Sequence, residues 1–172
     1  MRLISKIAIW TMMSLYIIVA SIAPTNATEK TKTDPQILCL AKNIYFEARN
    51  ETFEGMVAVA QVTLNRVKHN QFPNSICKVV YQKTRSNATN KIVCQFSWVC
   101  QDVGSPRYSS YKWQDCVDIA TNVVHHDLKL ISLASSLYYH NIHVKPGWNL
   151  ERLTKIGNHI FYSDAPAKKS KK

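Results

Sequence analysis

Residues 44–51 are IYFEARNE, and they place the carboxylate of Glu47 within an apolar helical pattern. Apolar residues recur at spacings of three and four between Ile37 and Ile44, which is typical of one buried face of a helix. Glu47 follows Ile44 by three residues, so we expect its side chain on or beside that face. Burial disfavours the charged form of a carboxylate and raises its pKa. A carboxylic acid that keeps its proton near neutral pH is suited to general acid catalysis.

A structural role for the same glutamate is the alternative. An ion pair with Arg49 or Lys42 near the end of the helix would favour the ionised form of Glu47. This octapeptide alone does not separate the two interpretations.

The chain begins with a segment typical of export. Basic residues near the start are followed by an apolar run, residues 7–23, and the small residues Ala23 and Ala27 are plausible cleavage points. We therefore predict a signal peptide over residues 1–27 and a folded part outside the cytoplasm, in the periplasm or cell envelope. An uncleaved N-terminal anchor in the membrane is the alternative, because the run is nearly long enough to span a bilayer.

The remainder of the 172-residue chain is long enough for one domain with its own core and too short for two. Residues 28–34 are predicted to be a linker, residues 35–164 the domain, and residues 165–172 a basic, disordered tail. We expect the protein to be a monomer.

The chain is strongly basic, with a formal net charge of +11 at pH 7. A positive surface favours polyanionic partners. Apart from the tail, the basic residues are spread along the sequence, and no nucleic-acid-binding motif is present, so we expect no nucleic acid as partner. For an exported protein the anionic bacterial wall is the expected partner, and a charge that serves solubility alone is the alternative.

All five cysteines lie beyond the export segment, where disulfides can form. Cys94 and Cys100 flank a loop short enough for a local bridge, and Cys39 on the first predicted helix is a candidate partner for Cys116 on a later one. An odd number leaves at least one cysteine unpaired within the chain. No cysteines or histidines have the spacing of a zinc site, so we predict no metal and no cofactor.

Helix signals come first along the domain and strand signals later. The dipeptide Asp34-Pro35 is suited to begin a helix. The predicted helices cover residues 35–49, about 53–67, 76–81 and 111–126. A polar loop is predicted over residues 83–91, a hairpin over 92–103, and short strands over 136–140 and 159–162 with a turn at 144–148 between them. This order predicts a mainly α domain of the α+β class with a small β-hairpin region.

Aromatic and polar side chains gather in segments that are predicted to be loops or strand ends. Sugars have apolar ring faces and hydroxyl edges, so aromatic rings beside amide and hydroxyl groups suit a glycan groove. The candidate substrate-binding residues are Tyr45, Gln95, Phe96, Ser97, Trp98, Tyr139, His140, Asn141 and Trp148. A place in the core explains each aromatic residue singly, and a structural role explains His140 equally well.

These segments form a pattern that resembles one protein family. Its parts are AKNIYFEARNE (residues 41–51), GMVAVAQVTLNRV (55–67), FPNSICKVVY (72–81), CQFSW (94–98), YHN (139–141), PGW (146–148) and IGNHIFY (156–162). In this order they resemble the SleB-type cell-wall hydrolases, the spore-cortex-lytic family, over about residues 38–164. The sequence departs from that pattern at Asn50, where the family commonly has Gly.

The resemblance implies a lysozyme-like fold that acts on the glycan strands of peptidoglycan, with Glu47 as the catalytic residue. SleB-type enzymes are associated with lytic transglycosylation, which cleaves between N-acetylmuramic acid and N-acetylglucosamine and leaves a 1,6-anhydromuramic end. That reaction needs one carboxylate, whereas ordinary glycosidases use two. We therefore expect Glu47 to act alone, as acid and then as base.

Two other functions fit the same residues. A hydrolytic muramidase would use a second carboxylate, for which Asp102 is the best candidate and Glu51 a weaker one. A peptidoglycan-binding protein that has kept the fold without catalysis is the other.

Overall fold

The computed structural model describes residues 33–87 and 89–167. The described residues belong to one compact unit. The predicted signal peptide or anchor and most of the predicted linker and tail lie outside the described residues. Within them no helix is long and apolar enough to cross a membrane.

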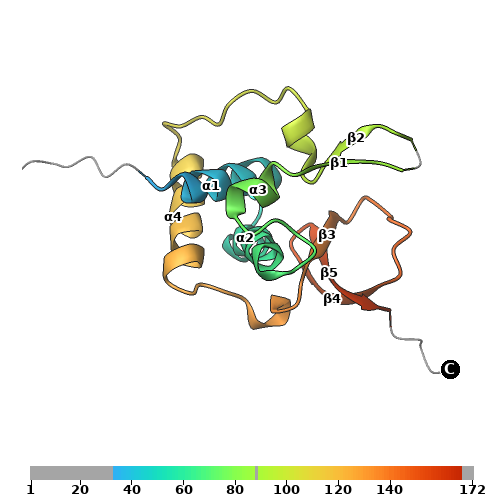
Figure 1. Cartoon of the computed structure of the whole chain (residues 1–172). Helices are drawn as coiled ribbons and strands as arrows, with labels where there is room; N and C mark the ends of the chain where they lie inside the picture. Colours follow the sequence, from blue (N-terminus) through green and yellow to red (C-terminus); the bar gives the residue numbers. More distant parts are fainter. Residues whose placement is uncertain (1–32, 88, 168–172) are drawn as a thin grey trace, which may run out of the picture. The chain divides into compact units, whose positions relative to one another are not determined.

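Four α-helices form the larger part of the unit (Figure 1). They are α1 (Pro35–Ala48), α2 (Phe53–Lys68), α3 (Ile76–Val80) and α4 (Tyr111–His125), with two short 3-10 helices, η1 (Ser97–Cys100) and η2 (Ile131–Leu133). The expected helices are confirmed with ends that shift by one residue. Their starts follow from local chemistry, because Asp34, Thr52 and Ser110 each cap a helix by accepting a backbone N–H with the side chain.

A three-stranded antiparallel sheet follows the helices, with strand order β3-β5-β4. It consists of β3 (Tyr138–Asn141), β4 (Leu150–Ile156) and β5 (His159–Pro166), and Tyr139 lies opposite Phe161. The two predicted strands are confirmed, and β5 extends beyond the expected range. Strand β4 was not expected, because three charged residues interrupt its apolar pattern. It lies at the edge of the sheet, and its pairing with β5 contains register irregularities.

The hairpin expected over residues 92–103 is wrong. Instead β2 (Ile92–Cys94) turns back on β1 (Lys83–Arg85), within the segment expected to be a loop, and the aromatic residues that follow form η1. The polar stretch between the strands supplies the turn, in which Asn90 has a positive φ of 55°. Asparagine adopts this left-handed conformation more readily than most residues.

The core is centred on α1, which packs against α2, α3 and α4. The main cluster contains Ile37, Leu40 and Ile44 from α1, with small residues of α2 and a set of α4 residues that includes Trp113. A second cluster of Ala58, Val62, Leu133 and Phe161 joins α2 to the sheet. Helix α2 therefore contacts both α1 and the sheet, and it sets the distance between them.

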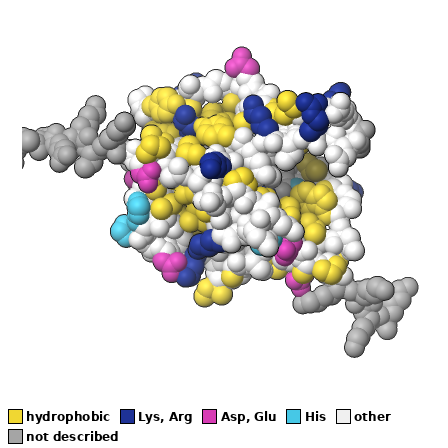
Figure 2. Space-filling model, viewed as in Figure 1, with side chains coloured by type: hydrophobic (Ala, Val, Ile, Leu, Met, Phe, Trp, Pro, Cys, Tyr) yellow, Lys and Arg dark blue, Asp and Glu magenta, His cyan; other side chains and the backbone are white. Residues whose placement is uncertain are grey.

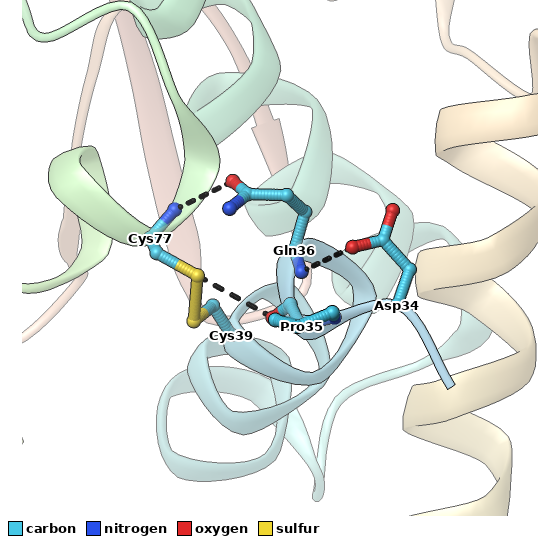
Figure 3. Close-up of a disulfide and its surroundings, with 5 residues drawn as sticks. All are labelled: Asp34, Pro35, Gln36, Cys39 and Cys77. Atoms are coloured by element: carbon cyan, nitrogen blue, oxygen red, sulfur yellow. Dashed lines mark hydrogen bonds between the residues drawn. A yellow bond between two sulfur atoms is a disulfide. The ribbon is translucent and has the colours of Figure 1, made fainter. Parts of the chain in front are cut away.

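Two disulfides are present among the described residues. Cys94 pairs with Cys100, as expected, and this bridge closes the short loop that contains η1. The expected pairing of Cys39 with Cys116 is wrong, because Cys39 pairs with Cys77 on α3, and Cys116 is a free, buried thiol in the core. Figure 3 shows the Cys39–Cys77 bridge beside Gln36, whose side-chain oxygen accepts the backbone N–H of Cys77 at 3.1 Å.

Basic side chains are dispersed on the face of the domain that Figure 2 shows. Figure 2 shows lysine and arginine side chains at several separate places on the face in view, with hydrophobic side chains between them.

We predict that the Cys39–Cys77 bridge stabilises the domain more than the Cys94–Cys100 bridge does. The first closes a loop with a sequence separation of 38 residues and the second one of 6. Loop-closure entropy then gives losses of about 4 and about 2 kcal/mol when each bridge is replaced by a pair of serines. Urea unfolding of the two double variants measures this, and equal losses would contradict it.

Candidate active site

Glu47 lies in the last turn of α1 with its side chain half-buried. Its Oε2 accepts a hydrogen bond from the Tyr139 hydroxyl on β3 at 3.1 Å. Burial raises the pKa of the Glu47 carboxyl above its ordinary value of 4.5, although the hydrogen bond from Tyr139 and the positive charge of Arg66 lower it. Since burial is the largest of these effects, the site favours the protonated acid.

Neither Arg49 nor Lys42 forms an ion pair with Glu47 among the described residues. Arg49 donates from Nη1 to the backbone oxygen of Tyr45 and lies over the Tyr45 ring, 4.8 Å from its centroid. The interpretation of Glu47 as an ion-paired glutamate at a helix end is therefore not supported.

Asn43, one helical turn before Glu47, fixes the orientation of this part of α1. It is fully buried, donates to Thr63 Oγ1 on α2 at 3.2 Å and accepts the indole N–H of Trp98 at 3.0 Å. Such a buried amide is costly unless its partners are present, so it holds α1, α2 and η1 in one arrangement.

Polar side chains of α2 place the strand that carries Tyr139. Gln61 exchanges two hydrogen bonds with the backbone of Leu130, at 2.7 and 3.0 Å. Asn65 donates to the carbonyls of Leu133 and Ser136, at 2.8 and 2.9 Å. The connection that leads into β3 is therefore tied to α2 along its length.

A cavity of about 300 Å³ opens beside Glu47. It is lined by Glu47, Arg66, Gln95, Phe96, Ser97, Tyr138, Tyr139, His140 and Trp148. Of the residues expected at the site, the structure thus brings together Glu47, Gln95, Phe96, Ser97, Tyr139, His140 and Trp148. These come from α1, from the segment around η1, from β3 and from the connection between β3 and β4.

Aromatic rings form one wall of the cavity. Trp148 is 44% exposed and contacts the rings of Tyr138, His140 and Tyr162, with centroids 6.0, 5.7 and 5.8 Å away. His140 uses both ring nitrogens within the sheet, one with the Asn141 carbonyl at 2.8 Å and one with the Tyr162 hydroxyl at 2.9 Å. These contacts give His140 a structural place in the wall rather than a free nitrogen for proton transfer.

Three of the expected substrate-binding residues do not line this cavity. Tyr45 is buried, and its hydroxyl accepts the backbone N–H of Arg107 at 3.3 Å. Trp98 stacks on Phe46 with centroids 4.7 Å apart and lines a separate hollow. Asn141 accepts the backbone N–H of His143 at the end of β3.

The other carboxylates considered for catalysis lie elsewhere. Asp102 lines the hollow beside Trp98, not the cavity at Glu47. Glu51 accepts the backbone and side-chain N–H groups of Asn158, at 3.0 and 3.1 Å, and so joins the α1–α2 connection to the β4–β5 turn. Glu47 is the one carboxylate among the described residues that line the cavity.

The cavity also contains two residues that the sequence did not single out, Arg66 and Tyr138. Arg66 is only 3% exposed. The sequence did contain a signal for the burial of Arg66. It follows Val62 by four residues, which places both on a buried face of α2. Tyr138 immediately precedes the motif YHN (residues 139–141), so the resemblance did not include it.

No group of three or more histidine, cysteine, aspartate or glutamate side chains is arranged to hold a metal within residues 33–87 and 89–167.

An α-helical unit whose first helix ends in a half-buried acid, facing a small sheet across a cavity, has the lysozyme-like α+β architecture. The chain belongs to the cell wall hydrolase family, whose sequence profile matches residues 50–162. The matched segment includes Arg66 and the aromatic wall and begins three residues after Glu47. The candidate role of Glu47 as the acid therefore rests on the geometry of the site and not on this match.

Curated relatives are similar over a short segment. The chain is 48% identical over 46 residues to the spore cortex-lytic enzyme of Bacillus subtilis strain 168, covering 27% of this chain and 15% of that enzyme. It is 44% identical over 46 residues to the spore cortex-lytic enzyme of Oceanobacillus iheyensis, covering 27% and 17%. The match therefore spans less than a fifth of these relatives.

Solved structures are similar over most of the described unit. The catalytic domain of the Bacillus cereus SleB protein has a TM-score of 0.54 and 29% identity, covering 74% of this chain and 89% of that one. The catalytic domain of the germination-specific lytic transglycosylase SleB from Bacillus anthracis has a TM-score of 0.56 and 28% identity, covering 78% and 98%.

We predict that the free energy of unfolding of Glu47→Gln, compared with that of the unaltered protein, is higher at neutral pH than at acidic pH. Because the folded state raises the pKa of Glu47, its stabilising contribution is complete below pH 4.5 and is lost as pH rises through the folded pKa. The glutamine does not titrate, so the difference in the free energy of unfolding should grow over that interval. Urea unfolding between pH 4 and pH 8 measures it, and a difference that does not change with pH would contradict the prediction.

We also predict that Gly157→Ala destabilises the domain by about 1–3 kcal/mol. Gly157 has a φ of 54°, and its added Cβ would collide with Glu51 Oε2, which accepts the backbone N–H of Asn158. Gly147→Ala is the matched control, because a Cβ there meets no atom within 4 Å and φ lies outside the left-handed region. Thermal unfolding of both variants checks this, and equal effects would contradict it.

Proposed function

We propose that this protein cleaves the glycan strands of peptidoglycan between N-acetylmuramic acid and N-acetylglucosamine by lytic transglycosylation. The observation that carries the proposal is that one half-buried acid with a raised pKa, Glu47, lines an aromatic-walled cavity without a second carboxylate among its described lining residues. Membership of the cell wall hydrolase family and the similarity to the catalytic domain of a lytic transglycosylase support the same reaction.

In the first half of the proposed reaction Glu47 acts as the acid. Its proton moves to the glycosidic oxygen, the bond from that oxygen to C1 of the muramic residue breaks, and N-acetylglucosamine leaves with a free 4-hydroxyl. Burial raises the pKa of Glu47 and so favours the protonated form that this step needs. The hydroxyl of Tyr139 holds the carboxyl through Oε2, so its orientation is set before substrate binds.

In the second half the Glu47 carboxylate acts as the base. It takes the proton of the muramic 6-hydroxyl while that oxygen bonds to C1, which forms the 1,6-anhydro ring and restores the acid. The Tyr139 hydrogen bond and the positive charge of Arg66 both favour the carboxylate at this stage. Water is not consumed, so no second carboxylate is needed to activate it.

The remaining residues of the cavity suit substrate binding. Trp148 offers an exposed ring, supported by Tyr138 and His140, on which the apolar face of a sugar can stack. Gln95 and Ser97 offer amide and hydroxyl groups to the hydroxyl edges of the same sugar. Peptidoglycan lies outside the cytoplasm, so we propose that the domain acts in the periplasm or cell envelope as a monomer, after export directed by residues 1–27.

Hydrolysis is the alternative that shares these residues. A hydrolytic muramidase would need a group that activates water, and Asp102 lines a different hollow. A protein that binds peptidoglycan without cleaving it is the second alternative.

We predict that Glu47→Gln lowers the rate at which purified sacculi are solubilised by about 100-fold or more, because it removes the general acid. The control is Glu54→Gln, which neutralises an exposed carboxylate in the first turn of α2 outside the cavity. Sacculus clearing and binding are measured for both variants and the unaltered protein. Normal clearing by Glu47→Gln would reject Glu47 as the catalytic residue, and an inactive unaltered protein that binds sacculi would support the non-catalytic alternative.

The masses of the released fragments separate transglycosylation from hydrolysis. An anhydromuramic end is lighter by one water than a reducing muramic end. We expect the anhydro product, and a digest that contains only reducing muramic ends would contradict transglycosylation.

A further inference from the structure

Arg66 is a buried cation in the wall of the Glu47 cavity. It lies in the last turn of α2 and is only 3% exposed. Arginine stays protonated in proteins, so its positive charge is taken out of water when the domain folds. A buried charge is costly unless it is paired and hydrogen-bonded.

Arg66 uses only part of its hydrogen-bonding capacity among the described residues. Nε donates to the carbonyl of Leu137 at 2.8 Å, and Nη1 has no hydrogen-bond partner among residues 33–87 and 89–167. No carboxylate among the described residues lies within ion-pair distance of the guanidinium. Aromatic faces surround it instead, with the rings of Phe96, Phe72 and Tyr138 centred 5.3, 5.4 and 6.0 Å from Cζ.

Support of the fold alone does not account for an arginine at this position. The connection that leads into β3 is already held by Asn65, which donates two hydrogen bonds to it, and by the two bonds of Gln61. The guanidinium adds one further bond to this connection and lies over aromatic rings, with no hydrogen-bond acceptor for Nη1 among the described residues.

The charges around the cavity favour an electron-rich ligand. Arg66 is positively charged, while burial raises the pKa of Glu47 and favours its neutral form. The other residues that line the cavity are aromatic or uncharged, apart from the titratable ring of His140, both of whose nitrogens are engaged. Charge-assisted hydrogen bonds to oxygen acceptors are about twice as strong as neutral ones, and the planar guanidinium can make two in parallel.

We propose that Arg66 binds an acyl oxygen, a carbonyl or carboxylate, on a substituent of the sugar that lies against Glu47. This inference rests on the proposed function, because it takes the ligand of the cavity to be a peptidoglycan strand. It makes Arg66 the residue that distinguishes acylated glycans from those that carry hydroxyl groups alone.

Two substituents of peptidoglycan supply such an oxygen. The acetamido group at C2 is present on both sugars, and the lactyl group at C3 is present only on the muramic residue. The chemistry that Arg66 recognises is common to both, so the experiment must separate the two sources.

Binding is measured in the Glu47→Gln background, so that no substrate is consumed. The probe is a tetrasaccharide of alternating N-acetylglucosamine and N-acetylmuramic acid without peptide, titrated by calorimetry. Arg66→Met should weaken its binding by about 10- to 100-fold, because a charge-assisted hydrogen bond is lost. Arg66→Lys keeps the positive charge but cannot make two parallel hydrogen bonds, so it should give a smaller loss of affinity. Arg152→Met is the control, since it removes an exposed arginine of β4 that does not line the cavity.

A second set of probes tests the same claim without altering Arg66. The Glu47→Gln protein is titrated with the tetrasaccharide after removal of its acetyl groups, and with an N-acetylglucosamine tetrasaccharide that lacks the lactyl group. A loss with the first probe assigns the acetamido group, and a loss with the second assigns the lactyl group. This arm identifies the substituent that the cavity recognises. Thermal unfolding establishes which Arg66 variants are folded, and if Arg66→Met is not, Arg66→Lys tests the part of Arg66 in binding.

Binding of all three probes with equal affinity would overturn the proposal, as would folded Arg66→Met binding within twofold of the Arg152→Met control. Failure of the proposed function is distinguished separately, because Glu47→Gln would then clear sacculi normally or the tetrasaccharide would not bind at all.

Discussion

The hydrogen bond from the Tyr139 hydroxyl to Glu47 Oε2 joins the end of α1 to β3 through two residues that are 92 positions apart in the sequence. It forms where the Glu47 side chain is partly buried, and this burial raises the pKa of the carboxyl. Burial also raises the pKa of Tyr139 well above its ordinary value, so the phenol remains a donor. One contact thus fixes the position of the Glu47 carboxyl, and the packing of α1 against the sheet determines how strongly its protonated form is favoured.

The arrangement that makes this contact possible is built by α2. Its apolar residues fill the core beneath α1 and beneath the sheet. Its polar residues, Gln61, Asn65 and Arg66, bind the backbone that leads into β3. Helix α2 therefore positions the strand that carries Tyr139, although the acid itself belongs to α1. Of the three polar residues, Arg66 also lines the cavity.

Local chemistry made much of the fold predictable. Helix α1 follows from the cap at Asp34 and from apolar spacing, and α2 follows from apolar spacing, signals that act within a few residues. The partly buried position of Glu47 was predictable for a similar reason, because its carboxylate follows the apolar stripe of α1 at helical spacing. The bridge between Cys94 and Cys100 required only a short loop.

The features that the sequence missed depend on contacts distant along the chain. Cys39 lies as close to Cys77 as it does because α3 packs on α1, a contact that spacing alone does not predict. Strand β4 is an edge strand whose charged residues conceal its pairing with β5. Trp98 has the aromatic ring expected of a surface that binds sugars. Its indole N–H donates to the buried Asn43, however, and the ring does not line the cavity.

The central claim is that burial keeps the Glu47 carboxyl protonated at a pH where ordinary glutamates are ionised. A pH titration of the ¹³C resonance of this carboxyl, assigned by comparison with Glu47→Gln, measures it directly. The predicted midpoint lies above the ordinary value of 4.5 and matches the pH at which the lytic rate declines on the alkaline side. A midpoint at or below 4.5 would contradict the account.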